Sequence, residues 1–381
     1  MSPSRTAPAE PTPLTAILME HIRAWGPITF AKYMDACLYH PQHGYYTKQE
    51  QSPRRDYFTS VDAKPIFARL LARQFREMWV QLGRPKEFLL VEPGAGTGAL
   101  AAQILDFTAD ALPEFYAALR YVAVERSGSR RAAAQGLFAK HLAADRFAMA
   151  SDLPAEIPCG CLFSNEFFDA LPVHRLVCEG HDLRETYVGC GTIGLCEEPG
   201  ALSTPALAEY LAEQAITLQD TQQAEVNLEA CSWIAEAAGR LRRGFSLTID
   251  YGHEARELYD QRHMRGTLLA YQKHRAGEDF FRAPGEQDLT AHVNFTALDL
   301  HASRAGLQRT GFTSQSKFLL ALARASDFAD LQSSSMSESE RTRATLLFKT
   351  LIYPEGMGET FQVLIQHKGI APAHLSGLDP L

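Results

Sequence analysis

Apolar residues in the first 85 positions recur at the spacing of amphipathic helices. Thr15–Trp25 and Thr29–Leu38 have this pattern, and Pro41 and Gly44 end the second segment. A longer helix is predicted between Pro65 and Gly83. Its apolar residues form one stripe: Phe67, Leu71, Phe75, Met78 and Leu82. We therefore predict that residues 1–85 form a short tail followed by a helical region.

From residue 86 to residue 381 short apolar runs alternate with helical stretches. The runs 88–91, 121–124, 146–150, 161–164 and 245–249 read as strands, and 99–107 and 130–140 read as helices. Such alternation is typical of βαβ units around a parallel sheet. The sequence thus predicts an α/β fold of the Rossmann-like kind over residues 86–381.

Two connections are too long for a minimal βαβ fold. One covers about 173–244 and begins with a predicted hairpin, Val173–Cys178 and Leu183–Val188; the other covers 251–296. Both leave from the carboxyl ends of strands, where open α/β sheets bind their ligands. We expect both connections to be substrate-side insertions.

Composition and charge narrow the class of protein. Hydrophobic residues make up 46% and charged residues 22% of 381, which is typical of a globular chain. The formal net charge of −8 disfavours nucleic acid and anionic membrane surfaces as partners. Without a long apolar run, we expect no membrane insertion. Seven scattered cysteines and a tail unlike a signal or transit peptide favour a reducing, cytoplasmic location.

A glycine loop follows the first predicted strand, in the segment FLLVEPGAGTG at 88–98. Gly94, Gly96 and Gly98 allow the backbone to turn sharply and to approach a ligand closely. With Ala99 the loop also satisfies the dinucleotide fingerprint, which alone is weak evidence. A nicotinamide or flavin dinucleotide, S-adenosylmethionine and a ligand-free turn all remain possible from the loop alone.

The positions of the acids favour S-adenosylmethionine. Glu92 ends the strand in front of the loop, where it could pair with the ammonium group of the cofactor but would repel a pyrophosphate. Glu125 ends the next strand and could bind both ribose hydroxyls, and Asp152 follows the third strand, where it could face the adenine amino group. We predict these three acids and the three glycines as cofactor-binding residues.

The next strand runs into SNEFFDALP, which we place at the reaction end of the cofactor. Asn165 is predicted on the cofactor side and Glu166 as a catalytic group. A guanidinium nucleophile has a pKa above 12, so acids must hold its charge and orient it. Asp169 could instead cap the next helix, and Phe167 and Phe168 could be core residues.

Further acceptor-side candidates follow the fifth strand. Asp250 and His253 lie in LTIDYGHE, and His292 lies in DLTAHVNF, where polar residues alternate along an extended segment. A single histidine is often a structural hydrogen-bond donor, and this alternative stays open for His253 and His292. Since the histidines lack metal-ligand spacing, we expect no metal.

These motifs resemble the MidA-like family of class I methyltransferases. The resemblance extends in order over nearly the whole chain: YMDACLYHPQHGYY, DYFTS, EPGAGTG, SNEFFDALPVHR, IDYGHE, GTLLAYQKHR, DLTAHVNF and GMGETFQVL. It implies S-adenosylmethionine as cofactor and a protein arginine as acceptor, because mitochondrial members of the family assist assembly of respiratory complex I and dimethylate an arginine of one of its subunits. A mitochondrial location would then apply to a eukaryotic chain.

The sequence departs from the family pattern at a few positions. Ala95 and Thr97 replace the usual proline and arginine of the loop, Val61-Asp62 replaces Pro-Glu after DYFTS, and Asn294 replaces an aspartate. The glycines survive, so the cofactor prediction holds better than the acceptor prediction. We predict an S-adenosylmethionine-dependent methyltransferase; a small-molecule acceptor or a non-catalytic, cofactor-binding assembly factor are the alternatives.

Overall fold

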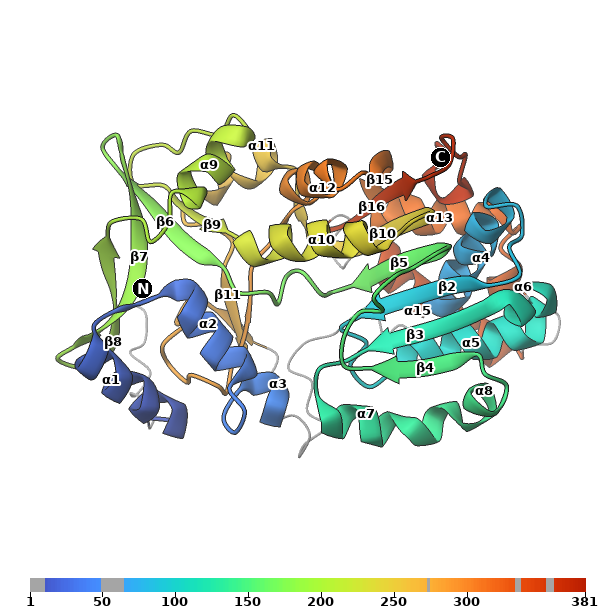
Figure 1. Cartoon of the computed structure of the whole chain (residues 1–381), viewed down its shortest axis with the longest axis horizontal. Coiled ribbons are helices and arrows are strands. Elements are labelled where there is room, and N and C mark those ends of the chain that lie inside the picture. Colours follow the sequence, from blue (N-terminus) through green and yellow to red (C-terminus); the bar gives the residue numbers. More distant parts are fainter. Residues whose placement is uncertain (1–10, 49–64, 273–274, 333–336, 354–359) are drawn as a thin grey trace. The chain divides into compact units, whose positions relative to one another are not determined.

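A computed structural model describes residues 11–48, 65–272, 275–332, 337–353 and 360–381 (Figure 1). The chain divides into two compact units. Unit 1 comprises Met1–Tyr57, Asp169–Ala230 and Glu254–Ala297, and unit 2 comprises Phe58–Phe168, Cys231–His253 and Leu298–Leu381. The family motif DYFTS and the departures at Val61 and Asp62 lie outside the described residues.

Unit 2 is built on a mixed sheet with a parallel centre. Its strands follow the order β15-β16-β10-β5-β2-β3-β4. Their bounds are Gln308–Ser314, Phe361–Lys368, Gly244–His253, Gly160–Asn165, Phe88–Pro93, Leu119–Val124 and Phe147–Ala150. Neighbours from β10 to β4 are parallel, as Figure 1 shows for β5, β2, β3 and β4, whereas β16 and β15 are antiparallel. The α/β, Rossmann-like prediction is confirmed, together with its five strands.

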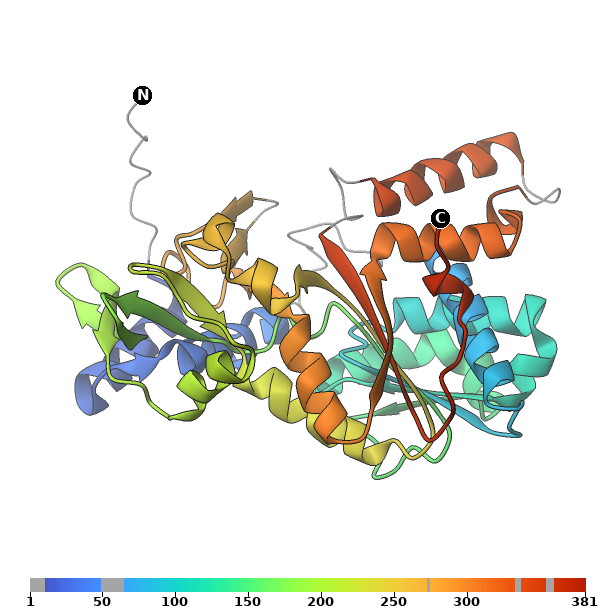
Figure 2. The same cartoon turned by 90° about the horizontal axis from the view of Figure 1, so that it is seen from above.

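Helices of unit 2 cover this sheet. They are α4 (Pro65–Gln81), α5 (Ala99–Ala111), α6 (Pro113–Ala118), α7 (Gly128–Ala134), α8 (Ala139–Ala143), α10 (Leu228–Arg240, mostly in this unit), α12 (Phe295–Arg304, likewise), α13 (Gln315–Ala325), α14 (Ala329–Gln332) and α15 (Glu338–Ile352). Figure 2 shows α13 and α15, in orange and red, side by side.

Two helix predictions need correction. The single helix expected over 130–140 is wrong, because a 3-10 turn at Gln135–Phe138 separates α7 from α8. Gly136 lies in that turn, and glycine is a poor residue for a helix interior. Helix α4, which the sequence analysis grouped with the N-terminal helices, belongs to unit 2. Its stripe is fully buried and packs on α5, so the boundary between the units precedes α4.

Unit 1 contains two small sheets and the N-terminal helices. One sheet has the order β1-β7-β6-β9 with β8 on β7, and the other has the order β12-β11-β13. The strands of these two sheets are β1 (Ile28–Thr29), β6 (His174–Glu179), β7 (Asp182–Gly191), β8 (Gly194–Gly200), β9 (Gln223–Val226), β11 (Leu269–Gln272), β12 (Arg275–Gly277) and β13 (Asp288–Thr290). The short strand β14 (Val293–Asn294) also lies in unit 1 but belongs to neither sheet. The predicted hairpin is confirmed as β6–β7, which turns at Gly180 with φ +66°.

The N-terminal helices α1 (Pro13–Trp25), α2 (Phe30–Tyr39) and α3 (Tyr45–Lys48) share a core with both long connections. Thr12 and Thr29 cap α1 and α2 by accepting backbone N–H groups. The buried Tyr33 hydroxyl donates a 2.6 Å hydrogen bond to the Phe280 carbonyl, and Tyr46 donates one of 2.8 Å to Asp288. Short helices α9 (Ala206–Glu213) and α11 (Ala255–Leu258) complete the unit.

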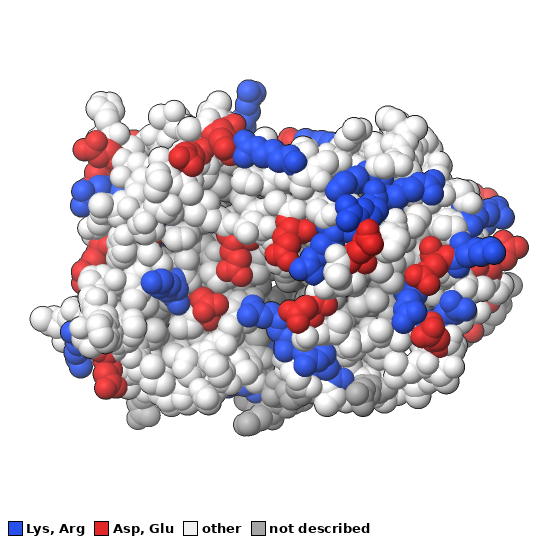
Figure 3. Space-filling view, viewed as in Figure 1, with Lys and Arg blue, Asp and Glu red and all other residues white. Residues whose placement is uncertain are grey.

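The surface carries both signs of charge. On the face in Figure 3, Lys and Arg side chains lie among Asp and Glu side chains. None of the helices in the described part of the chain is long and apolar enough to cross a bilayer.

Candidate functional site

The glycine loop of unit 2 connects β2 to α5 at the carboxyl edge of the sheet. Gly94, Gly96 and Gly98 have φ angles of +67°, +56° and +73°, in the left-handed region. A Cβ atom added at Gly94 or Gly98 would lie 2.8 Å from the ring of Phe167 or Phe138, respectively. Two of the glycines therefore allow aromatic rings to approach the backbone.

Gly96 differs from the other two glycines. An added Cβ atom there would meet nothing nearer than the Gly94 carbonyl at 3.9 Å. Its neighbour Ala95 donates a 3.2 Å hydrogen bond to the carbonyl of Val124, which ends β3. The middle of the loop thus lies beside β3 and leaves open space, as a loop that a ligand approaches closely should.

Glu92 is a buried acid at the end of β2. The Tyr121 hydroxyl donates a 2.8 Å hydrogen bond to Glu92 Oε2. Burial raises the pKa of the Glu92 carboxyl from 4.5 to about 7, and the Tyr121 bond opposes part of this rise. A desolvated carboxylate of this kind gains from a cationic ligand group, which fits the ammonium pairing predicted from the sequence.

Glu125 follows β3 and supports the glycine loop. Its Oε2 accepts a 3.1 Å hydrogen bond from the Gly96 N–H, and its Oε1 accepts one of 2.9 Å from the Ser127 N–H. The Arg130 guanidinium lies 3.7 Å from Oε2. Since a carboxylate offers about four lone-pair positions, the predicted ribose contact is compatible with these bonds.

The other predicted cofactor residues follow the neighbouring strands. Asp152 is exposed after β4 and accepts a 2.7 Å hydrogen bond from the Ser151 hydroxyl. Asn165 is the buried last residue of β5, and its Nδ2 donates a 3.2 Å hydrogen bond to Glu166 Oε1. The parallel arrangement therefore brings these polar groups to the same edge as the glycine loop.

The predicted catalytic residue Glu166 has an unusual backbone. Its φ of +51° lies in the left-handed region, which costs a residue with a side chain about 1 kcal/mol. The Glu166 N–H donates a 3.0 Å hydrogen bond to the Ile249 carbonyl on β10. This conformation turns the chain directly after β5, at the end of the strand that carries Asn165.

Asp250 and His253 lie on β10. Asp250 is fully buried, and its carboxylate accepts hydrogen bonds from the backbone N–H groups of Phe167, Phe168 and Tyr251. His253 is the half-buried last residue of β10. Their predicted acceptor-side roles stay predictions.

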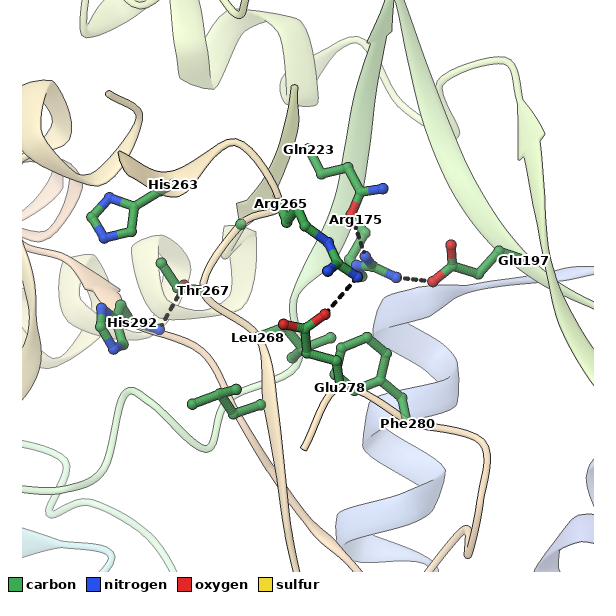
Figure 4. Close-up of a pocket in the computed structure, with 12 residues that line it drawn as sticks. Arg175, Glu197, Gln223, His263, Arg265, Thr267, Leu268, Glu278, Phe280 and His292 are labelled. Atoms are coloured by element: carbon green, nitrogen blue, oxygen red, sulfur yellow. Dashed lines mark hydrogen bonds and ion pairs between the residues drawn. The ribbon is translucent and has the colours of Figure 1, made fainter. Parts of the chain in front are cut away.

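His292 belongs to unit 1, where it lines a pocket of about 290 Å³ (Figure 4). Its N–H donates a 3.1 Å hydrogen bond to Thr267 Oγ1, and its ring centroid lies 6.3 Å from that of His263. Among its neighbours in DLTAHVNF, Asp288, Thr290 and Asn294 are buried. Asn294 accepts the Ala297 N–H and donates to Gln214, so this departure from the family pattern has a structural role.

The same pocket has a fixed cation in its wall. The Arg175 guanidinium lies 5.2 Å from the Phe30 ring centroid and 5.1 Å from that of Phe280, and it pairs with Glu197 and with Gln223 Oε1. Arg265 pairs with Glu278 across 2.5 Å, and Figure 4 shows both pairs facing the pocket. The pocket therefore presents carboxylates that are held by arginines.

Sequence reasoning missed two residues of the unit 2 site. Tyr121 is the partner of Glu92, and Trp233 on α10 lies with its ring centroid 4.6 Å from that of Phe167 and 5.4 Å from that of Phe168. In the sequence Tyr121 looks like a core residue of a strand, and Trp233 looks like a core residue of a helix. Only the tertiary fold shows which neighbours they meet.

Comparison with known proteins identifies the class of the site. Residues 70–313 match the family described as "Putative S-adenosyl-L-methionine-dependent methyltransferase". A protein arginine methyltransferase NDUFAF7, mitochondrial, from Danio rerio is 30% identical, with 91% of this chain and 84% of the relative covered. The human NDUFAF7 is 29% identical, with 94% and 84% covered.

A solved structure is also similar. A superfamily member from Burkholderia thailandensis bound to S-adenosyl-homocysteine has a TM-score of 0.85 and 30% identity, with 96% of this chain and 94% of that chain covered.

The residues of unit 2 fit the cofactor of this family. Gly96 leaves its side of the loop open, and Glu92 is a buried acid whose desolvated carboxylate would be stabilised by a cationic partner. Glu125 and Asn165 add acceptors and donors at the same edge. The MidA-like resemblance and the cofactor prediction are confirmed: this chain belongs to the family of S-adenosyl-L-methionine-dependent methyltransferases.

Proposed function

We propose that this methyltransferase modifies arginine side chains on a protein acceptor. The observation that carries the proposal is the similarity to protein arginine methyltransferases over more than nine-tenths of the chain. Similarity along both units, and not only along the cofactor-binding residues, supports an acceptor of the same class. Nucleic acid stays an unexpected partner, because the net charge is −8.

The bound cofactor would supply an electrophilic methyl group on its sulfonium. In our proposal Glu166 accepts a hydrogen bond from an N–H of the acceptor guanidinium, so that one nitrogen points at the methyl carbon. Orientation of this kind can lower a barrier by several kcal/mol. The new N–C bond would replace the sulfonium S–C bond, which would leave S-adenosylhomocysteine, and the proton released by the nitrogen would pass to Glu166. Glu92, Glu125 and Asn165 keep the cofactor in place, and Asp152 is proposed to meet its adenine.

Unit 1 is proposed to bind the acceptor protein. Its pocket contains Glu197 and Glu278, whose side chains are 37% and 52% exposed and are paired with Arg175 and Arg265; in our proposal a basic segment of the acceptor competes with these arginines for the two carboxylates. His292 lies in the wall of the same pocket. A protein acceptor needs a broad binding surface, and the two long connections provide most of unit 1.

The test is transfer of a labelled methyl group. The protein and radiolabelled cofactor are incubated with a lysate of a strain that lacks this gene, and labelled proteins are analysed by mass spectrometry. Label on arginine supports the proposal. Label only in the small-molecule fraction would assign a small-molecule acceptor, and binding without any transfer would assign a non-catalytic role.

We also propose a reducing, cytoplasmic location for the chain. None of the seven cysteines, all of which lie in the described part of the chain, forms a disulfide, and burial raises the pKa of Cys37 to about 12, which keeps that thiol protonated and unreactive. The eukaryotic relatives are named as mitochondrial proteins. Fractionation of cells, followed by detection of the protein in each fraction, tests this proposal.

A further inference from the structure

Asp250 has a distinctive set of hydrogen bonds in unit 2. Its side chain is 0% exposed, and Oδ2 accepts the N–H groups of Phe167 at 3.1 Å and Phe168 at 2.9 Å. Oδ1 accepts the N–H of Tyr251 at 3.0 Å. A carboxylate on β10 thus binds the backbone of the loop that follows β5.

These bonds fix the two residues that follow the strained turn at Glu166. Glu166 has φ +51°, and such a conformation persists only where the surroundings hold it. The Ile249 carbonyl accepts the hydrogen bond of the Glu166 N–H. Asp250, the next residue on β10, accepts the N–H groups of the two residues that follow Glu166. Removal of the carboxylate would leave both groups without this acceptor.

The position of the loop also determines what meets the cofactor loop. The Phe167 ring lies 2.8 Å from the position that a Cβ atom added to Gly94 would take, which is too close for a side chain at that position. Phe167 and Phe168 both pack on Trp233, with ring centroids 4.6 Å and 5.4 Å away. The Asp250 carboxylate therefore determines the position of Glu166 and the position of the Phe167 ring beside Gly94.

We infer that Asp250 is a positioning residue that holds Glu166 and Phe167 in place for methyl transfer, and that it does not itself contact the acceptor. This assigns Asp250 a different role from the acceptor-side role that its place in the sequence suggests. The inference rests on the methyltransferase activity of the family and is independent of the arginine acceptor.

Trp233 provides a direct readout of the loop. The chain has three tryptophans, so replacement of Trp25 and Trp79 by Phe leaves Trp233 as the only one. In that background we compare Asp250→Ala and Asp250→Asn with the parent. The measurements are Trp233 emission and acrylamide quenching, affinity for S-adenosylhomocysteine by calorimetry, and total label transferred to proteins of the deletion-strain lysate.

Asp250→Ala should shift Trp233 emission and weaken the affinity for S-adenosylhomocysteine by a few-fold. It should also lower methyl transfer by about 100-fold, because misplacement of a reacting group has effects of this size. Asp250→Asn should recover transfer to within about 10-fold of the parent, because its side-chain oxygen can still accept the Phe167 and Phe168 N–H groups. Its amide would meet the Tyr251 N–H unfavourably, so full recovery is not expected.

Thr248→Val is the matched control. Thr248 lies two residues before Asp250 on β10 and shares a buried 3.3 Å hydrogen bond with Ser164 on β5. Its loss should lower the melting temperature but leave Trp233 emission and methyl transfer unchanged.

Two outcomes would overturn the inference. One is an Asp250→Asn protein that is as inactive as Asp250→Ala while its Trp233 emission equals that of the parent, because the charge itself would then act on the substrate. The other is an unmoved Trp233 signal in Asp250→Ala with full transfer. If Asp250→Ala does not fold, Trp233 emission and methyl transfer in Asp250→Asn decide between a positioning role and a direct role. If the parent labels no protein, the acceptor proposal fails, and the Trp233 and affinity data still decide the role of Asp250.

Discussion

The hydroxyl of Tyr121 donates a 2.8 Å hydrogen bond to the carboxylate of Glu92, and both residues are buried on neighbouring strands of unit 2. Burial raises the pKa of Glu92 to about 7, and the Tyr121 bond limits the rise by favouring the ionised form. The acid that we assign to the cofactor ammonium therefore changes its charge near neutral pH.

Cofactor affinity should follow this charge. Below pH 7 Glu92 takes up a proton and loses its attraction for the ammonium, so affinity for S-adenosylhomocysteine should fall by up to tenfold per pH unit. The ligand's α-amino group, which stands beside a free carboxylate, keeps its proton to higher pH than a peptide N-terminus does. Calorimetric titration from pH 5.5 to 9 should therefore show affinity that rises with pH through about 7 and then levels off.

Tyr121→Phe should move the acidic limb of that profile to higher pH, because the ionised carboxylate loses its donor. Tyr116→Phe is the matched control, since its hydroxyl bonds His141 elsewhere in unit 2. A profile that Tyr121→Phe leaves unchanged would remove Glu92 from the ammonium site.

Glu92→Gln tests how the Glu92 charge affects the stability of the fold, apart from its effect on cofactor binding. The raised pKa means that the folded state holds the Glu92 proton more tightly than the unfolded chain, so this contribution to stability is present below pH 4.5 and is lost as pH rises through about 7. The variant should therefore gain up to about 3 kcal/mol of stability at pH 8 and nothing at pH 4. Urea unfolding at the two pH values measures the difference; equal gains at both would contradict the assignment.

Gly96→Val should abolish cofactor binding. The φ of +56° disfavours a β-branched residue, and the side chain would enter the open space of the loop. Gly180→Val is a matched control, because Gly180 has φ +66° and nothing within 4 Å of an added Cβ atom, but lies in the β6–β7 turn of unit 1. Both variants should lose similar stability, and only Gly96→Val should lose S-adenosylhomocysteine affinity in calorimetry.

The spacing of apolar residues and the residues that end each run made much of unit 2 predictable. The strand 88–91 is a continuous apolar run, and 245–249 alternates apolar residues with Ser246 and Thr248; both are bounded by glycine or charged residues, so their existence follows from local pattern. Unit 1 was not predictable in the same way. Its core joins Leu14 and Phe30 to Val188 and Leu268, residues from three distant segments whose periodicity gives no sign of their common core.

The site shows the same limit. Glycines and strand-ending acids mark the cofactor edge because their residue types are unusual at those positions. The roles of Asp250 and Tyr121 depend instead on which groups their side chains reach, namely the Phe167 N–H and the Glu92 carboxylate. A fully buried aspartate and an interior strand tyrosine look like any polar residue near a strand end until the strands are paired.

Glu166→Gln tests the catalytic assignment. The amide has the shape of the carboxylate but no charge, so turnover should fall by at least about 100-fold. The melting temperature and the cofactor affinity should equal those of the parent. Glu166→Gly should lose turnover equally and should in addition unfold at a higher temperature, because glycine relieves the φ of +51°. Loss of cofactor binding in Glu166→Gln would reassign this residue to the cofactor site.

His292→Ala tests the acceptor role of unit 1. His292 lines the unit 1 pocket, and the exposed His181 at the β6–β7 turn provides a control of the same chemistry outside it. If the pocket binds the acceptor, His292→Ala should lower methyl transfer to lysate proteins at least about 10-fold through a higher KM, with unchanged S-adenosylhomocysteine affinity, and His181→Ala should change neither. A structural role predicts a different result, because the His292 ring packs against the His263 ring, with centroids 6.3 Å apart, and its loss would loosen the segment. Melting temperature would then fall together with activity, and methylation at the parent rate would exclude His292 from the acceptor site.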